Sequence, residues 1–168
     1  APTAPLSVYG RTKLAGEREA LALPRSLVVR TSWLFGPGGT NFVATIVGRI
    51  TAGARRLEVV QDQEGCPTYT PFLARALLDL ASLPLEGIVH YRNREPVSWY
   101  AFADEIARLW ASDVEVVPVT TAQVPRPAPR PAYSVLDVSR CEAALKRRVE
   151  PWGWGLVEYL AAIRRGRG

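Results

Sequence analysis

The chain has 168 residues, 48% of them apolar, which is enough for a domain with a buried core. The formal net charge of +5 comes from scattered basic residues without a nucleic-acid-binding motif, so we expect attraction to small anions and not to DNA or RNA. No run of about 18 apolar residues could span a membrane, and no signal-peptide pattern is present. Cys66 and Cys141 suggest neither a disulfide framework nor a metal site, which favours two idle thiols in a cytoplasmic protein.

Helical and extended patterns alternate along the chain, which predicts an α/β fold. The first helix is expected from about Ser7, a plausible N-cap, to Leu23, because Pro24 stops it. A continuously apolar strand follows at 27–34 and suits burial on both faces of a parallel sheet. Further helices are predicted at 42–54, 70–83, 98–110, 139–148 and 155–164, and further strands at 57–60, 87–91 and 114–119.

Two segments near the end of the chain lack a helical or strand pattern. The proline-rich stretch at 125–131 is expected to be an extended surface strap. Arg167 and Gly168 are expected to fray.

One pair of residues in the first predicted helix could carry chemistry. Tyr9 and Lys13 are four residues apart, so they share one helix face. An ammonium group close to a phenol favours the phenolate, which provides a proton donor and acceptor for redox chemistry at a carbonyl. On spacing alone, an ordinary surface Tyr and Lys is the commoner explanation. The sequence has two lysines, however, Lys13 and Lys146. Because one of the two lies four residues after Tyr9, a specific role for this pair is favoured.

The context of this pair resembles the extended short-chain dehydrogenase/reductases, and among them the dTDP-4-dehydrorhamnose reductases. The resembling stretches are 5–17, 30–36, 39–42, 62–68, 87–91 and 129–137. The resemblance implies an incomplete NAD(P)-binding Rossmann fold interleaved with a small α/β sugar-nucleotide-binding domain. It assigns the last Rossmann helix and strand to 1–40, a substrate-domain insertion to 41–69, a returning Rossmann helix and strand to 70–92, and the rest of the substrate domain to 93–168.

The resemblance covers only the C-terminal portion of such a protein. The sequence contains no Met, and no glycine fingerprint for a pyrophosphate lies at a strand-to-helix turn near its start. The loop at 36–39 lacks that spacing and fits a simple turn. We therefore expect a fragment that is inactive alone, with the N-terminal half of the same protein as its partner. A homodimer is the alternative way to cover an exposed strand edge.

The resemblance also implies roles for individual residues. Tyr9 would donate a proton to a 4-keto oxygen as NADPH or NADH delivers hydride, while Lys13 would favour ionisation of Tyr9 and bind the nicotinamide ribose. Thr31 would contact the cofactor as well. The sugar-nucleotide cleft would be lined by Trp33, Asn41, Asp62, Gln63 and Arg130, with Arg130 suited to the diphosphate. A core position for Trp33 and a solvent-facing Arg130 are the structural alternatives. No metal is expected, because Pro71 stands where some relatives carry a metal-binding carboxylate.

The implied reaction is the reduction of dTDP-4-dehydro-6-deoxy-L-mannose to dTDP-L-rhamnose, a step toward cell-surface polysaccharide. Two alternatives stay open: a non-catalytic binding protein resembling the regulatory β subunit of methionine adenosyltransferase, and a reductase or epimerase of another nucleotide sugar. Glu17, one turn beyond Lys13, could compete for it as an exposed pair worth about 0.3–0.5 kcal/mol. His90 is expected to be a packed residue and not a metal ligand.

Overall fold

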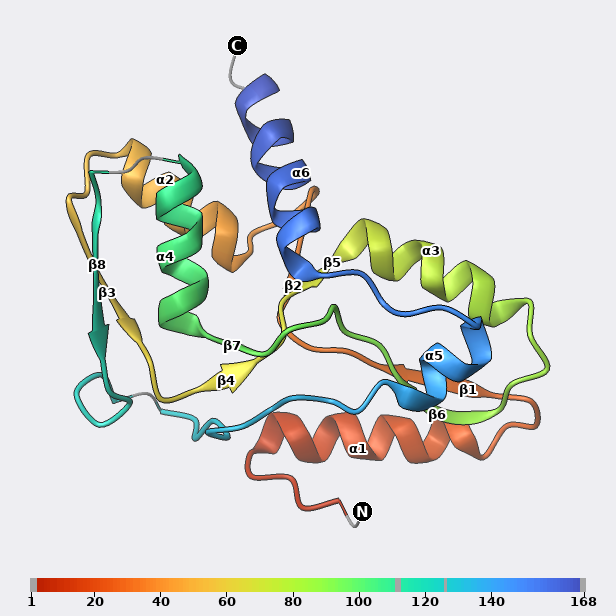
Figure 1. The fold of residues 1–168 in the computed structure, drawn as a ribbon. Coiled ribbons are helices and arrows are strands. Elements are labelled where there is room, and N and C mark those ends of the chain that lie inside the picture. The colour runs from red at the N-terminus through yellow and green to blue at the C-terminus, as the bar shows by residue number, and fades with distance from the viewer. Residues whose placement is uncertain (1–2, 111–112, 126, 167–168) are drawn as a thin grey trace.

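The computed structural model describes residues 3–110, 113–125 and 127–166 and shows a mixed α/β fold (Figure 1). Among these residues the strands form four two-stranded sheets. Arg126 of the proline-rich segment and the predicted frayed end, Arg167 and Gly168, lie outside the described residues.

One half of the molecule surrounds a parallel strand pair, β1 (Leu27–Arg30) and β6 (Gly87–His90). Helix α1 (Val8–Leu21) lies along one side of this pair, and α3 (Thr70–Ala81) lies along the other (Figure 1). Helix α5 (Ser139–Leu145) packs against β6 and α3. The parallel pairing is the one that the apolar pattern of these strands predicts.

The other half is built on a second parallel pair, β3 (Arg56–Val60) and β8 (Glu115–Val119). Helices α2 (Phe42–Thr51) and α4 (Trp99–Trp110) pack together, and α4 also contacts both strands. The two halves therefore each place helices against a small parallel sheet.

Short strands connect these halves. Strands β2 (Leu34–Phe35) and β5 (Thr68–Tyr69) pair in parallel, whereas β4 (Glu64–Gly65) and β7 (Val97–Ser98) pair antiparallel. Helix α6 (Trp152–Arg165) packs on β5 and α4, and its C-terminal end projects from the molecule (Figure 1). The proline-rich segment continues into an extended stretch that pairs with β4, through a bridge between Glu64 and Tyr133.

Side chains at helix starts explain where three helices begin. The hydroxyl of Ser7 accepts a 3.1 Å hydrogen bond from the Gly10 N–H, and that of Ser98 accepts one of the same length from Ala101. Asn41 accepts a 3.0 Å bond from the Ala44 N–H in the same way. Each satisfies a backbone donor that the first helical turn leaves free. The predicted N-caps at Ser7 and Ser98 are confirmed.

Several predicted elements are wrong in their bounds. The helices expected at 42–54 and 139–148 end earlier, at Thr51 and Leu145. The expected strand at 27–34 is interrupted, because Trp33 adopts a left-handed φ of 49° that ends β1 and restarts the chain in β2. Its first four residues are half-buried and not fully covered. The last helix begins at Trp152 instead of Gly155. The extended backbone of Pro151 precedes its first turn, and both Gly153 and Gly155 are helical.

An aromatic cluster fills the junction of the two halves. The ring centroid of Phe35 lies 5.4 Å from that of Tyr69, 5.6 Å from that of Phe102 and 6.2 Å from that of Tyr159. These four rings come from β2, β5, α4 and α6, so one buried cluster fixes how the short strands meet the helices. Cys66 and Cys141 are also buried and unpaired, as predicted, and burial raises the pKa of both thiols.

Candidate active site

Tyr9 and Lys13 lie on α1 and face solvent together. The Lys13 Nζ is 5.4 Å from the centroid of the Tyr9 ring, within the range of a cation–π contact. The Tyr9 side chain is 70% exposed. The helical spacing predicted for this pair is therefore present, and the phenol is open to a partner from outside the described residues.

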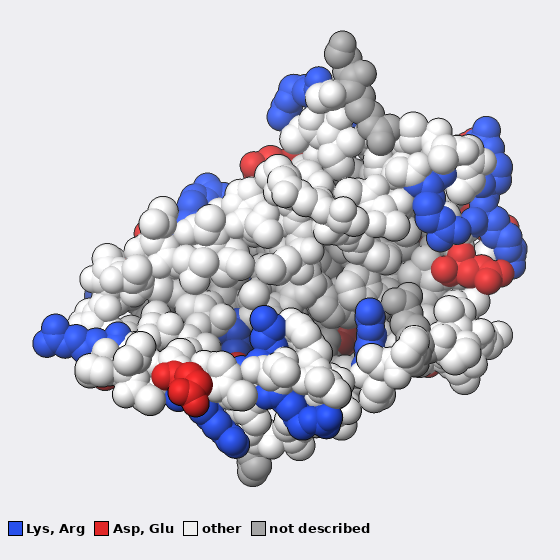
Figure 2. All heavy atoms as spheres, turned by 180° about the vertical axis from the view of Figure 1, so that it is seen from behind, with Lys and Arg blue, Asp and Glu red and all other residues white. Residues whose placement is uncertain are grey.

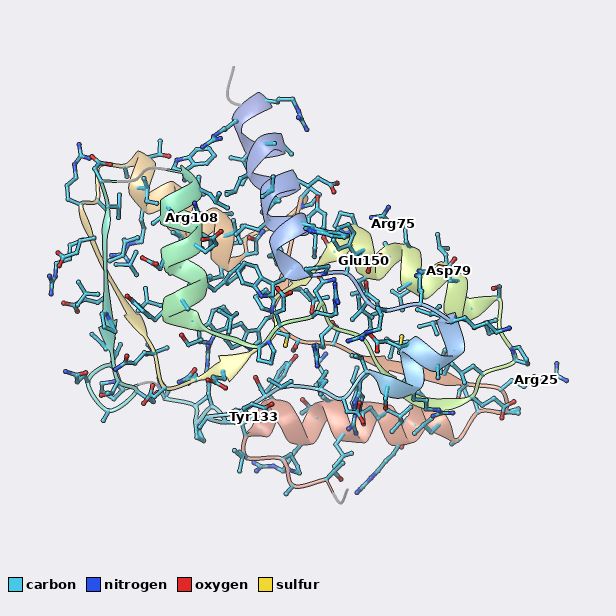
Figure 3. All side chains as sticks on the ribbon, viewed as in Figure 1. Arg25, Arg75, Asp79, Arg108, Tyr133 and Glu150 are labelled. Atoms are coloured by element: carbon cyan, nitrogen blue, oxygen red, sulfur yellow. The ribbon has the colours of Figure 1, made fainter. Side chains whose placement is uncertain are left out.

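Lys13 also borders an open cavity of about 690 Å³. Arg30 and His90, the last residues of β1 and β6, line it together with residues 133–136. Figure 3 shows Tyr133 beside the first turns of α1. Ligands of open α/β sheets bind outside the carboxyl ends of parallel strands, so this cavity lies where a nucleotide would be expected.

Glu17 points into the same cavity but does not pair with Lys13. Its two carboxylate oxygens accept hydrogen bonds of 2.8 and 2.6 Å from Arg30 of β1. This two-pronged contact with the guanidinium lowers the pKa of Glu17. The expected competition of Glu17 for Lys13 is therefore replaced by an ion pair between α1 and β1.

His90, the cross-strand neighbour of Arg30, is half-buried and lines the same cavity. Its Nδ1 lies 3.0 Å from the backbone oxygen of Asp137. The carboxylate of Asp137 in turn accepts hydrogen bonds from the N–H and hydroxyl of Ser139, which lower its pKa.

Thr31 follows β1 directly and carries an unpaired polar atom. Its hydroxyl oxygen is buried, and the structure gives it no hydrogen-bond partner among the described residues. Buried polar groups are normally satisfied, so an unpaired hydroxyl at the end of a parallel strand fits a contact with a bound ligand. Thr31 is not among the residues that line the cavity beside Lys13, and its cofactor role stays a prediction.

Trp33 lies between the two halves and is covered by another tryptophan. Its ring stacks on Trp99 with centroids 3.5 Å apart and planes inclined by 8°. Gly65 also lies close to this ring, so that any side chain there would overlap it. The left-handed backbone and this packing together fix the orientation of the indole.

Asn41 uses its amide within the fold. In addition to capping α2, its Nδ2 lies 2.9 Å from the Gly36 oxygen and 3.0 Å from the Tyr159 hydroxyl. The side chain thus ties the loop at 36–40 to α6. A substrate bound by Asn41 would have to displace one of these partners.

Asp62 and Gln63 converge on a single residue. Both follow β3, and Thr121 follows its partner strand β8. The Asp62 carboxylate accepts bonds from the Thr121 N–H and hydroxyl, at 2.7 to 3.0 Å, which lower its pKa. Gln63 is buried and donates from Nε2 to the same hydroxyl at 2.9 Å.

Arg130 borders a second cavity of about 310 Å³ beside α2. Arg49 from the last turn of α2 and Trp99 from the start of α4 share its lining, and Glu58 adds one carboxylate. Two guanidinium groups against one carboxylate suit an anionic ligand, with the indole available for a ring. Trp33 reaches this cavity only through its stack on Trp99.

The structure therefore groups some predicted residues and separates others. Lys13 lies at the first cavity and Arg130 at the second, whereas Asn41, Asp62 and Gln63 are bonded within loops between them. Sequence reasoning missed Trp99, Arg49 and Tyr133. Arg49 could have been found from its spacing with Phe42 and Thr45 on one helix face.

Basic and acidic side chains are mixed on one face of the molecule. Figure 2 shows Lys and Arg dispersed over the face that it displays, with Asp and Glu among them. Within the described residues, no helix has the length and apolar character needed to cross a membrane.

The mixed α/β fold, with helices packed against two small parallel strand pairs, is that of the extended short-chain reductase class. The family model described as RmlD substrate binding domain matches residues 1–165. The chain belongs to this family.

Named relatives agree with this assignment. The chain is 44% identical to dTDP-4-dehydrorhamnose reductase of Streptomyces griseus, covering 99% of this chain and 58% of that protein. It is 43% identical to a probable dTDP-4,6-dihydroxy-2-methyloxan-3-one 4-ketoreductase of Streptomyces antibioticus, covering 96% and 56%. The crystal structure of dTDP-4-dehydrorhamnose reductase from Bacillus anthracis in complex with NADP superposes with a TM-score of 0.91 and 32% identity, covering 96% and 58%. The chain thus spans somewhat more than half the length of these proteins.

Proposed function

We propose that this chain supplies the catalytic pair and the sugar-nucleotide side of an NADPH- or NADH-dependent reductase. The proposed reaction converts dTDP-4-dehydro-6-deoxy-L-mannose to dTDP-L-rhamnose. The observation that carries this proposal is the position of Tyr9 and Lys13, side by side on α1 with Lys13 at the cavity beyond β1 and β6. The names of the relatives support the choice of reaction.

The described residues fit one end of a nicotinamide cofactor. Lys13 offers an ammonium to ribose hydroxyls, and Thr31 offers its unpaired hydroxyl. When bound, the cofactor would supply hydride to the carbonyl carbon. Tyr9 would hold the proton that the 4-keto oxygen receives, and the positive charge of Lys13 would stabilise the phenolate that this transfer leaves.

The sugar nucleotide would occupy the space near the second cavity. Arg130 and Arg49 are placed to bind a diphosphate, and the exposed edges of the stacked Trp33 and Trp99 would border a ring. Asn41, Asp62 and Gln63 would act here through the loops that they hold in place. The division into Rossmann segments at 1–40 and 70–92 and substrate-domain segments at 41–69 and 93–168 is part of this proposal.

The decisive experiment measures reduction of the dTDP-4-keto sugar by the full-length protein. The reaction is monitored through the loss of absorbance of the reduced nicotinamide. We expect Tyr9→Phe to lower kcat by about 10²–10⁴-fold, the usual contribution of a positioned general acid. Lys13→Met should also lower kcat, whereas Lys146→Met, on the exposed end of α5, should not. Full activity of Tyr9→Phe would overturn the assignment. Saturable binding without turnover by the wild type would favour the non-catalytic homologue instead.

The sugar itself is a separate question, because the Streptomyces antibioticus relative is named for a different dTDP-keto sugar. Competition between the two keto sugars in the same assay separates these substrates. A higher kcat/KM for the sugar of that relative would correct the substrate while leaving the roles of Tyr9 and Lys13 intact.

We also propose a partner for the face around β1. This strand pairs with β6 alone among the described strands, so its other edge is free. Beside it lies an apolar cavity of about 330 Å³, whose walls include Leu77 and Leu80 of α3. An unpaired parallel strand between helices calls for another strand, and the relatives are longer than this chain. We therefore place the N-terminal part of the same protein on this face.

Co-expression of this chain with the N-terminal segment tests that arrangement. We expect a one-to-one complex that binds NADPH, while the chain alone shows no turnover. A chain that binds NADPH tightly without the segment would contradict the proposal.

Two free, buried thiols suit a reducing compartment, so we place the protein in the cytoplasm.

A further inference from the structure

We propose that Arg30 is a positioning residue for Lys13. By holding Glu17, it keeps the carboxylate one helical turn from Lys13 away from the ammonium, which stays against Tyr9 and open to the cavity. The proposal rests on the proposed function in one respect, namely that Lys13 is the catalytic lysine.

Helix geometry places Glu17 within reach of Lys13. Residues four apart on a helix face the same side, and oppositely charged pairs at this spacing form readily. Both side chains also line the same cavity. With nothing else nearby, the ammonium of Lys13 would turn toward Glu17 and away from the Tyr9 ring.

Arg30 prevents this because it is the stronger partner. Its guanidinium meets both oxygens of Glu17, at 2.8 and 2.6 Å, in the planar arrangement that an ammonium cannot match. The side chains are 28% and 16% exposed, so the pair is shielded from competing water. None of the ion pairs found among residues 3–110, 113–125 and 127–166 includes Lys13.

The other charged or titratable groups around Lys13 do not replace Glu17. Tyr9 precedes it on α1, and His90 of β6 and Tyr133 line the same cavity. His90 is held by the backbone oxygen of Asp137 through Nδ1. Glu17 is thus the carboxylate among the residues that line this cavity. Its ion pair with Arg30 determines whether the ammonium of Lys13 stays beside Tyr9 or turns toward Glu17.

The two lysines of the chain make this testable by NMR. Reductive methylation with ¹³C-formaldehyde labels Lys13 and Lys146 while keeping their positive charge, and the α-amine gives a separate signal. We expect the Lys13 methyl groups of the wild-type chain to show an upfield ring-current shift and a nuclear Overhauser effect to the Tyr9 ring. Lys146, exposed at the end of α5, is the internal control.

Three variants separate positioning from simple tethering of α1 to β1. In Arg30→Gln, the freed Glu17 should draw Lys13 away, so that the upfield shift and the Overhauser effect are lost. The double variant Arg30→Gln/Glu17→Gln should restore both signals, because no carboxylate remains to compete. Glu17→Gln alone should leave them intact. The Lys146 signal should stay unchanged throughout, and far-UV circular dichroism checks that each variant is folded.

The outcomes that overturn the proposal are equally distinct. An unchanged Lys13 signal in Arg30→Gln means that Glu17 does not compete for the ammonium. Equal disturbance in Glu17→Gln, Arg30→Gln and the double variant means that the pair is only a tether, and this comparison remains available if Arg30→Gln alone does not fold. Because the readout involves no turnover, its failure leaves the reductase assay untouched, and failure of that assay leaves this result standing.

Discussion

The ion pair of Glu17 and Arg30 makes folding sensitive to acid. The hydrogen bonds from Arg30 hold the pKa of Glu17 below its ordinary value, which is about 4.3 in an unfolded chain. Its stabilisation is therefore fully present above that value and is lost as the pH falls through the lower, folded pKa. We expect Glu17→Gln to reduce the free energy of unfolding by about 1 kcal/mol at neutral pH.

This difference should shrink as the pH falls through the lowered pKa of the folded protein, because the Glu17 carboxylate of the wild type is then protonated. Urea denaturation at several pH values measures it. Glu19→Gln, at an exposed position on the same helix, is the matched control and should change little. A difference that persists at low pH would mean that the Glu17 carboxylate is not responsible.

A second prediction at the residue scale concerns Gly65. A Cβ at this position would overlap the Trp33 ring, which is itself held in a stack with Trp99. We expect Gly65→Ala to destabilise the chain by about 2 kcal/mol and to change its tryptophan fluorescence. Gly39→Ala, where a Cβ meets nothing within 4 Å, should do neither. Normal stability of Gly65→Ala would show that the indole pair can slide.

At the scale of elements, α6 offers two glycines with opposite surroundings. A Cβ at Gly155 would lie 2.5 Å from Tyr69, whereas one at Gly153 would meet nothing within 4 Å. Alanine favours a helix over glycine by about 1 kcal/mol, so Gly153→Ala should raise the melting temperature. Gly155→Ala should lower it despite the same gain in helix propensity, because α6 must move off β5. Thermal unfolding of both variants checks the sign of each change.

Elements with a periodic pattern were predictable from the sequence, and those set by distant contacts were not. Helix α3 and the caps at Ser7 and Ser98 depend on local spacing and hydrogen bonds, and both are confirmed. Strands β4 and β7 have two residues each, too few to show a period, and they form because the chain brings them together. Trp33 broke its predicted strand for the same reason, since its conformation is held by Trp99.

In the candidate site, too, features set by local spacing were predictable and those set by distant contacts were not. The spacing of Tyr9 and Lys13 predicted a shared face, which the structure shows. The partner of Glu17 could not be predicted, because Arg30 is distant in sequence and local spacing pointed to Lys13. Trp99 was missed because a tryptophan at a helix start has no pattern that distinguishes a cavity wall from a core residue.

At the scale of the whole molecule, the apolar surface of α3 predicts self-association. Leu77 is 40% exposed and lines the cavity beside β1 together with Leu27 and Val29. Apolar patches at an open strand edge tend to be covered. We expect concentration-dependent dimers of the chain in sedimentation equilibrium, weakened by Leu77→Lys. Val157→Lys on α6, which is 57% exposed, is the control and should not weaken them. The opposite pattern would move the interface to α6.

The pairing of the strands also determines how the chain must fold. None of the four sheets in the described part joins consecutive strands: Leu27 meets Gly87, and Arg56 meets Glu115. No hairpin can therefore form early and serve as a local nucleus, and each pairing must first close a long loop. Proteins dominated by such non-local contacts fold slowly and expose apolar strands while they do so. A chain built this way will refold best when dilute, with its helices formed well before its sheets.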